Sequence, residues 1–159
     1  MPVDAVQRSV TVPLTPEQAF DLFTARIGDW WPGATHSVAA NSGDVPSKIE
    51  IEPRPGGAIT ETTKDGATHL WGSVVTYDKG KRLVLDWHPA AEADQAGCVE
   101  VVFAVSDMGC RVELTHSGFE AMANPDKAAL RADYAAGWQH ILQDCLLPAC
   151  AVRRTSVMV

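Results

Sequence analysis

Residues 124–147 constrain the fold more than any other stretch of the sequence. Apolar side chains recur there at steps of three and four residues: Leu130, Tyr134, Trp138, Ile141 and Cys145. This spacing predicts a helix with one apolar face. At ~1.5 Å per residue such a helix reaches roughly 35 Å, about the width of a small domain. Because the sequence before it is rich in strand patterns, we expect this helix to lie across a sheet.

Both ends of the expected helix carry local signals. Asn124 can cap its first turn, and Pro125 suits the first helical position, where no amide donor is needed. Asp126 suits the positive end of the helix dipole. At the other end, we expect Pro148 to stop or kink the helix, because its ring carries no N–H.

Length and charge limit the classes of function. With 159 residues, 46% of them hydrophobic, the chain suits one compact domain. A net charge of −7, with no basic cluster beyond residues 153–154, disfavours nucleic acid and anionic membranes as partners. No apolar run approaches the ~20 residues of a membrane-spanning helix, and residues 1–12 lack a signal-peptide pattern, so we expect a cytoplasmic protein. Its cysteines show no CxxC spacing and are expected to be reduced thiols.

A strand and a helix are expected before the strand-rich region. Residues 6–12 alternate as in a half-buried strand. Thr15, Pro16 and Gln18 combine an N-cap, a proline at the first helical position and a capping-box residue. They predict a helix that runs to about residue 25.

A second short helical turn is expected over residues 27–32, which include Trp30 and Trp31. Two adjacent side chains cannot point in one direction on a helix, so the two rings must diverge. The loop over residues 33–45 is long and rich in small residues, which is typical of functional or mobile loops. We expect it to cover an opening between the N-terminal helices and the sheet.

Six strands are expected in succession, over residues 48–54, 58–63, 68–77, 82–88, 98–106 and 110–117. The pairs at 65–66, 79–80 and 108–109 are turn signals, and short turns imply antiparallel neighbours. A two-residue turn at 79–80 would set Gly72 opposite Trp87, where the glycine leaves space for the indole.

The last hairpin predicts the position of a histidine. If residues 107–108 form its turn, Val99 faces His116. His116, together with Val112 and Leu114, then lies on the face that meets the C-terminal helix. The alternate residues face solvent, as in an antiparallel sheet covered on one side: Arg111, Glu113 and Thr115.

Together these patterns predict an α+β fold: one strand, two short helices, six antiparallel strands and a long C-terminal helix. A twisted sheet of six or seven strands curls. A helix laid across its concave side leaves a cavity between helix and sheet.

Few motifs of catalysis are present. The five histidines show neither HxxxH nor HExxH spacing, and no glycine-rich phosphate loop is found. No metal, cofactor or nucleotide is therefore predicted. His116 with Glu113 or Glu120 could perform acid–base chemistry, but a buried histidine satisfied by one hydrogen bond is the commoner case. Arg54 and Glu61 lie on alternating strands, where each has even odds of facing water or a cavity.

The chain is notable for its tryptophans: Trp30, Trp31, Trp71, Trp87 and Trp138. Rigid aromatic surface suits a pocket for a flat or apolar ligand, and it equally suits a core. Gly137 beside Trp138 breaks the amphipathic pattern, which a close backbone contact or a cavity wall would explain.

An ordered set of short motifs carries a resemblance to a known family. These motifs are IGDWWP at 27–32 with His36 after it, PRPGG at 53–57, DG at 65–66, WGSV at 71–74, RLVLDW at 82–87, VEVVF at 99–103, LTHSGF at 114–119, and Tyr134 followed by GW at 137–138. The chain resembles the START-like (SRPBCC) superfamily, in the branch named after the activator of a heat-shock-protein ATPase (AHSA-like). The resemblance implies a helix-grip fold over residues 1–159 as a single domain, with a hydrophobic cavity. Members bind lipids, steroids or polyketides, and some are cyclases or parts of oxygenases. They share no catalytic residue set.

Three functions follow as hypotheses. The first is the binding of a small hydrophobic or aromatic ligand in the cavity. Its wall is expected to include Trp30, Trp31, Trp87, Phe103, His116, Tyr134, Trp138 and Ile141. The second is a cyclase- or hydrolase-type enzyme using His116 and a carboxylate. The third is a module that contacts a protein partner or a second copy of itself through the sheet or the 33–45 loop.

Overall fold

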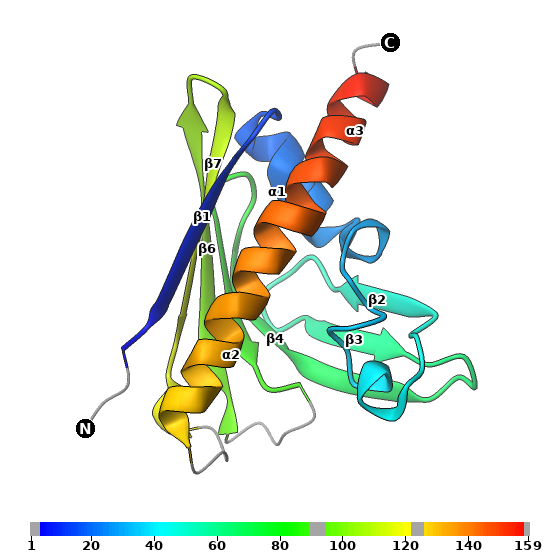
Figure 1. Cartoon of the computed structure of the whole chain (residues 1–159). Coiled ribbons are helices and arrows are strands. Elements are labelled where there is room, and N and C mark those ends of the chain that lie inside the picture. The colour runs from blue at the N-terminus through cyan, green and yellow to red at the C-terminus, as the bar shows by residue number, and fades with distance from the viewer. Residues whose placement is uncertain (1–3, 90–94, 122–125, 158–159) are drawn as a thin grey trace.

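The computed structural model describes residues 4–89, 95–121 and 126–157. Within them, the strands form one seven-stranded antiparallel sheet in the order β1-β7-β6-β5-β4-β3-β2. The strands are β1 (Val6–Val12), β2 (Lys48–Ile51), β3 (Ala58–Thr62), β4 (Thr68–Asp78), β5 (Arg82–Trp87), β6 (Gly97–Ser106) and β7 (Gly109–Ser117). The sheet curls around a long C-terminal helix, as the α+β helix-grip prediction required (Figure 1).

The N-terminal helix α1 (Pro16–Thr24) forms as its sequence predicts. The Thr15 side chain accepts a hydrogen bond from the Gln18 amide, and the Gln18 side chain accepts one from the Thr15 amide. This reciprocal capping satisfies two donors that the first turn of a helix leaves unpaired. The single turn η1 (Ile27–Asp29) follows, and a second 3₁₀ turn, η2 (Ala39–Ser42), lies inside the 33–45 loop.

The C-terminal helix begins and continues differently from the prediction. Asp126, rather than Asn124, caps α2 (Lys127–His140) by accepting a hydrogen bond from the amide of Ala129. Asn124 and Pro125 lie outside the described residues. After α2, a π-helical segment η5 (Ile141–Leu146) leads into α3 (Leu147–Val157).

Pro148 therefore does not end the helix. In a regular α-helix its ring would clash with the carbonyl of residue 144, and the hydrogen bond to that carbonyl would be missing. The wider π turns immediately before Pro148, in which the Leu147 amide bonds the carbonyl of Leu142 five residues back, change the spacing at which the ring would clash. Residues 127–157 thus form one continuous helical segment across the concave face of the sheet (Figure 1).

The predicted pairing of β4 with β5 is confirmed, although its turn is longer than expected. Gly72 lies opposite Trp87, and an added Cβ at Gly72 would lie 1.9 Å from the carbonyl oxygen of Asp86. The turn contains three residues, 79–81, and the bulge at Val75 restores the register. The hairpin with the 65–66 signal is also longer than two residues, because the amide of residue 63 bonds the carbonyl of residue 67.

The last hairpin agrees with the prediction in full. The turn at 107–108 pairs Val99 with His116, and His116 lies on the buried face together with Val112 and Leu114. Thr115 is half-buried on the other face, where Arg111 and Glu113 are exposed and form an ion pair.

Candidate functional site

A pocket of about 530 Å³, open to solvent, lies between α2, strands β4 and β5, and the 33–45 loop. The helix contributes Leu130, Asp133, Tyr134, Gly137 and Trp138, and Ile141 follows at the start of η5. The loop contributes Thr35, His36, Ser37, Val38 and Asn41. The remaining wall residues are Trp31, Trp71, Trp87 and Pro89.

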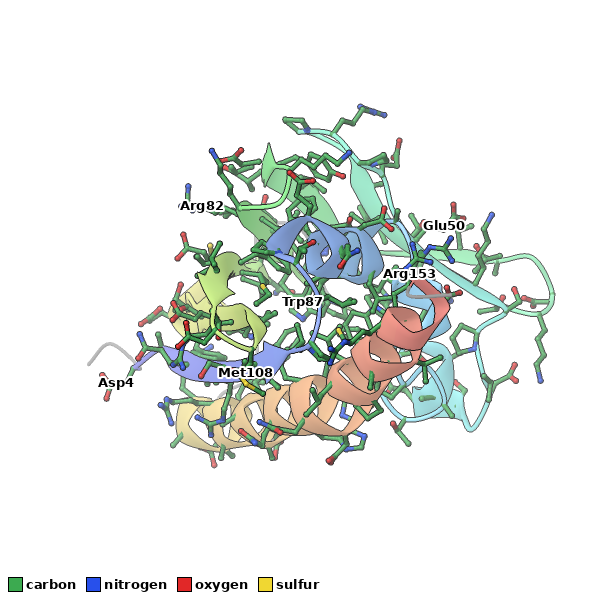
Figure 2. The ribbon with its side chains drawn as sticks, turned by 90° about the horizontal axis from the view of Figure 1, so that it is seen from above. Asp4, Glu50, Arg82, Trp87, Met108 and Arg153 are labelled. Atoms are coloured by element: carbon green, nitrogen blue, oxygen red, sulfur yellow. The ribbon has the colours of Figure 1, made fainter. Side chains whose placement is uncertain are left out.

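Four tryptophan side chains form the inner wall. Trp31 packs against Trp71, Trp87 and Trp138, with ring centroids 5.4, 5.8 and 5.9 Å apart. Trp87 also contacts Trp71 at 5.7 Å and Trp138 at 5.3 Å. Tilted and edge-to-face contacts at these separations are the favoured geometries of aromatic pairs. In Figure 2, Trp87 lies in the interior between the C-terminal helix and the sheet, away from the peripheral Asp4 and Arg82.

The adjacent tryptophans diverge, as predicted. Their ring planes make an angle of 60°. Trp31 enters the pocket wall, and its Nε1 donates a hydrogen bond to the carbonyl oxygen of His36 at 2.7 Å. Trp30 turns into the core against Phe23 and donates to the carbonyl oxygen of Leu22 at 2.8 Å.

The predicted wall residues divide into two groups. Five of them line the pocket: Trp31, Trp87, Tyr134, Trp138 and Ile141. The other three, Trp30, Phe103 and His116, are core residues of the structure rather than pocket residues. Phe103 points under α1, where its ring packs 5.1 Å from that of Phe20. Ligand contact by the five pocket residues stays a prediction.

His116 lies behind the pocket wall. The side chain is fully buried, and its Nδ1 accepts a hydrogen bond from Trp138 Nε1 at 2.9 Å. Burial lowers the pKa of His116 to about 4, so the ring is neutral near pH 7. The carboxylates considered for acid–base work, Glu113 and Glu120, are exposed. The site geometry therefore gives no support to catalysis by His116.

A buried carboxylate fixes the 33–45 loop to the sheet. Glu61 on β3 has no exposed surface and accepts hydrogen bonds from the amides of Val38 and Ala39 at 2.8 and 2.7 Å. It also accepts one from Trp71 Nε1 at 2.8 Å. These charge-assisted bonds hold a loop segment and a pocket tryptophan together. Ile59 and Glu61 share the buried face of β3, and this spacing from an apolar residue is the sequence signal that could have placed Glu61 inside. Arg54, by contrast, is exposed and pairs with Glu52.

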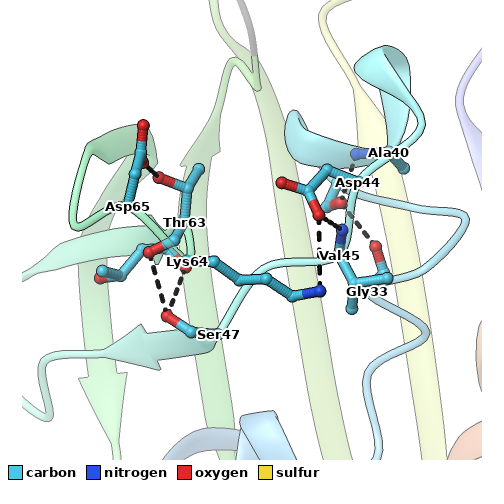
Figure 3. Close-up of polar contacts among 10 residues, drawn as sticks. Gly33, Ala40, Asp44, Val45, Ser47, Thr63, Lys64 and Asp65 are labelled. Atoms are coloured by element: carbon cyan, nitrogen blue, oxygen red, sulfur yellow. Dashed lines mark hydrogen bonds and ion pairs between the residues drawn. The ribbon is translucent and has the colours of Figure 1, made fainter.

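Further bonds stabilise the loop near its ends (Figure 3). Asp44 accepts a hydrogen bond from the amide of Val45 and lies 3.6 Å from Lys64 Nζ. Ser47 donates to the carbonyl oxygen of Thr63 at 3.2 Å, and Thr63 in turn bonds the side chain of Asp65. The 33–45 loop is therefore attached to the β3–β4 hairpin at its end as well as at Glu61.

Two histidines join the loop to the helix at the pocket rim. The rings of His36 and His140 stack with centroids 5.5 Å apart. Thr35 Oγ1 lies 2.7 Å from His36 Nδ1, and Asp144 Oδ2 lies 3.0 Å from His140 Nδ1. Burial lowers the pKa of His36, and the proximity of His140 lowers it further.

Gly137 on α2 lies beside His36. A Cβ added at Gly137 would lie 3.7 Å from His36 Nε2, an ordinary van der Waals distance. A longer side chain would enter the pocket, because Gly137 is part of its wall. The second explanation offered for the Gly137–Trp138 pair, a cavity wall, is the one that fits the geometry.

The described part of the chain contains no cluster of metal ligands, no membrane-spanning helix and no disulfide. Among residues 4–89, 95–121 and 126–157, no three His, Cys, Asp or Glu side chains are grouped so as to hold a metal ion. The same residues include no helix with the length and apolar character needed to cross a membrane. The four cysteines are unpaired thiols.

Comparison with known proteins gives a family and a set of similar folds. The family model described as "Activator of Hsp90 ATPase homolog 1-like protein" matches residues 13–146. No curated protein matches the sequence. The crystal structure of MLL2253 from Mesorhizobium loti superposes with a TM-score of 0.66 at 16% identity, over 94% of this chain and 98% of that one.

Two further solved structures carry descriptive names. The Aha1 dimer from Colwellia psychrerythraea has a TM-score of 0.56 at 13% identity, over 84% of this chain and 90% of that one. The anthrahydroquino-gamma-pyrone synthase Txn09, solved as a complex, has a TM-score of 0.57 at 29% identity, over 77% of this chain and 82% of that one. At 16% and 13% identity, the similarity to MLL2253 and to the Aha1 dimer shows a shared fold and nothing further.

Proposed function

This chain belongs to the family of Activator of Hsp90 ATPase homolog 1-like proteins, and from that premise we propose that it binds a small hydrophobic or aromatic molecule in the pocket between α2 and the sheet. We further propose that the protein acts in the cytoplasm and that binding needs no cofactor. The family name is no guide to its partner, because the sequence has no feature specific to chaperone binding.

The observation that carries the proposal is the wall of four indoles. Trp31, Trp71, Trp87 and Trp138 are each at most 8% exposed, yet all four border the same 530 Å³ space. A wall of large rigid rings suits a flat apolar ligand, which gains by leaving water and stacking on the rings, while six polar residues of the same pocket can contact polar groups of the ligand.

Turnover in the same pocket is the second candidate. It is favoured by the 29% identity to a protein described as a synthase. His116 does not border the pocket, so the ionisable groups at the wall that would serve such chemistry are His36, Asp133 and Tyr134. Product analysis with any compound that binds separates catalysis from binding.

A protein-interaction role has less support. The large exposed apolar side chains of the described residues are spread over the 33–45 loop, β4, β6, the β6–β7 turn and α3: Val45, Leu70, Val75, Val105, Met108 and Val152. An interface is marked by a contiguous apolar patch, and no single helix or strand carries most of these residues.

Binding can be tested with a panel of flat aromatic compounds that includes fluorene. The pocket tryptophans should report binding by a change in fluorescence, and a ligand should raise the melting temperature. Gly137→Leu fills the pocket from the helix side, and Gly137→Ala is its matched control, since the added Cβ meets nothing closer than 3.7 Å. We expect Gly137→Leu to weaken fluorene binding at least roughly tenfold while Gly137→Ala leaves it nearly unchanged, a steric effect. Equal binding by both variants would reject this pocket as the site.

A further inference from the structure

One polar group in the wall of the aromatic pocket lacks a hydrogen-bond partner in the described part of the chain. Within the described residues, Nε1 of Trp87 is buried and has no hydrogen-bond partner. Indole Nε1 is a donor only, and a buried donor without an acceptor costs free energy. Because more than nine-tenths of such groups find a partner, this unpaired one needs an explanation.

Tyr134 is a neighbouring pocket residue that carries a hydroxyl. Burial raises the pKa of Tyr134, and the Trp87 N–H opposes that rise. No hydrogen bond joins the two groups in the free protein, since Trp87 Nε1 has no partner among the described residues. Both residues border the pocket, and Tyr134 is only partly buried.

The ring of Tyr134 is held in place from behind. It packs edge-on against His116 with centroids 4.5 Å apart, and it lies 5.9 Å from Phe119. A phenol fixed in this way can present its hydroxyl at a constant position. Its oxygen can accept from the Trp87 N–H, and its proton then remains free to donate.

We propose that the pocket recognises ligands with a carbonyl oxygen set in a flat apolar frame, through a hydrogen bond from Tyr134 that is backed by the Trp87 N–H. This inference rests on the proposed function and narrows it to one class of ligand. A carbonyl oxygen that accepts the Tyr134 proton makes the phenol oxygen a stronger acceptor, which favours a new hydrogen bond from the unpaired Trp87 N–H, and hydrogen bonds in such a chain strengthen one another. A hydrocarbon of the same shape would leave the chain incomplete.

Fluorene and 9-fluorenone provide a matched pair of probes, since they share one flat tricyclic frame and differ in a CH₂ against a C=O. We expect wild-type protein to bind 9-fluorenone roughly tenfold more tightly than fluorene, the gain of about one well-made hydrogen bond. Tyr134→Phe should abolish this preference and leave fluorene affinity within about twofold, because it removes the hydroxyl and retains the ring. Tyr77→Phe is the control, because Tyr77 packs against Phe20 and does not border the pocket.

Infrared spectroscopy gives a second readout that a change in packing would not mimic. The carbonyl stretch of bound 9-fluorenone should lie at lower frequency in wild-type protein and in Tyr77→Phe than in Tyr134→Phe. Equal affinities for the two probes in wild-type protein would overturn the inference while leaving the proposed function intact, as would a ketone preference that survives in Tyr134→Phe. If neither probe binds and no compound of the aromatic panel does so, the proposed function and the inference both fail.

Discussion

Trp138 on the C-terminal helix donates a hydrogen bond from Nε1 to Nδ1 of His116 on β7, over 2.9 Å. An imidazole nitrogen that accepts a hydrogen bond carries no proton, so the neutral ring of His116 holds its proton on Nε2. The bond lies beneath the pocket wall and links the helix to the centre of the sheet. It makes both residues structural supports for the aromatic cluster.

Replacing Trp138 should separate the effect of its ring from that of its N–H. Trp138 is 2% exposed, so Trp138→Ala should reduce the free energy of unfolding by ~3–5 kcal/mol. Trp138→Phe keeps most of the ring but leaves His116 Nδ1 without a donor, which should cost ~1–3 kcal/mol. Urea denaturation measures both values, with Val152→Ala at an exposed position of α3 as the control. A loss far below 3 kcal/mol for Trp138→Ala would indicate that water already fills the space beside the ring.

The pKa of His116 predicts how stability depends on pH. Because its folded-state pKa, about 4, lies below the ordinary 6.5, the unfolded chain takes up a proton first as pH falls. The contribution of neutral His116 is complete above pH 6.5 and is lost as the pH falls toward 4, at up to ~1.4 kcal/mol per pH unit. His116→Asn can retain an acceptor for Trp138 without titrating. Denaturation curves from pH 7.5 to 4 should show a shallower loss for this variant than for wild type, and identical slopes would contradict the assignment.

Glu61 is predicted to be needed for the attachment of the 33–45 loop. In wild-type protein the Glu61 carboxylate accepts hydrogen bonds from three N–H groups. In Glu61→Gln the side-chain NH₂ must face one of these donors, which should destabilise the protein by ~1–3 kcal/mol. The amides of Val38 and Ala39 should then exchange faster with solvent. Glu50→Gln on the neighbouring strand removes an exposed ion pair with Lys48 and should change stability by less than ~1 kcal/mol. Similar losses in the two variants would show that burial of Glu61 confers no special role.

The loop should also respond to a ligand. Since Glu61 holds Val38 and Ala39, we expect their amides to be the best protected of the loop in the free protein, with faster exchange elsewhere in residues 33–45. A pocket ligand such as 9-fluorenone should slow that exchange, because an ordered lid has fewer open states. Hydrogen-exchange mass spectrometry with and without the probe measures the change. Protection that appears elsewhere, with residues 33–45 unaffected, would place the entrance at another edge of the groove.

The fold was predictable because its signals are local. The capping box at Thr15 and Gln18 starts α1 through hydrogen bonds within four consecutive residues. The alternation of β7 decides which face of the sheet His116 occupies. Register followed from the predicted short turn in the β6–β7 hairpin, where Ser106 pairs with Gly109. The pairing of Gly72 with Trp87 was correct even though a longer turn and a bulge at Val75 compensate each other.

The candidate site was only partly predictable. Trp30 and Trp31 have the same residue type and adjacent positions, and the sequence showed only that their rings diverge. The packing of Trp30 against Phe23 and of Trp31 against Trp71 decided which ring borders the pocket. Glu61 likewise had even odds of facing inward, and its three donors come from Trp71 and from a loop more than twenty residues away.

The sequence by itself determined the elements, their order and the face that most strand residues occupy, because hydrogen bonding and burial along one strand or helix repeat with fixed periods. Only the tertiary structure decided where the helix lies relative to the curled sheet, and so which aromatic rings fill the core and which border space. That choice depends on the summed shapes of side chains from α1, β3, β5 and α2, and no single period in the sequence records it.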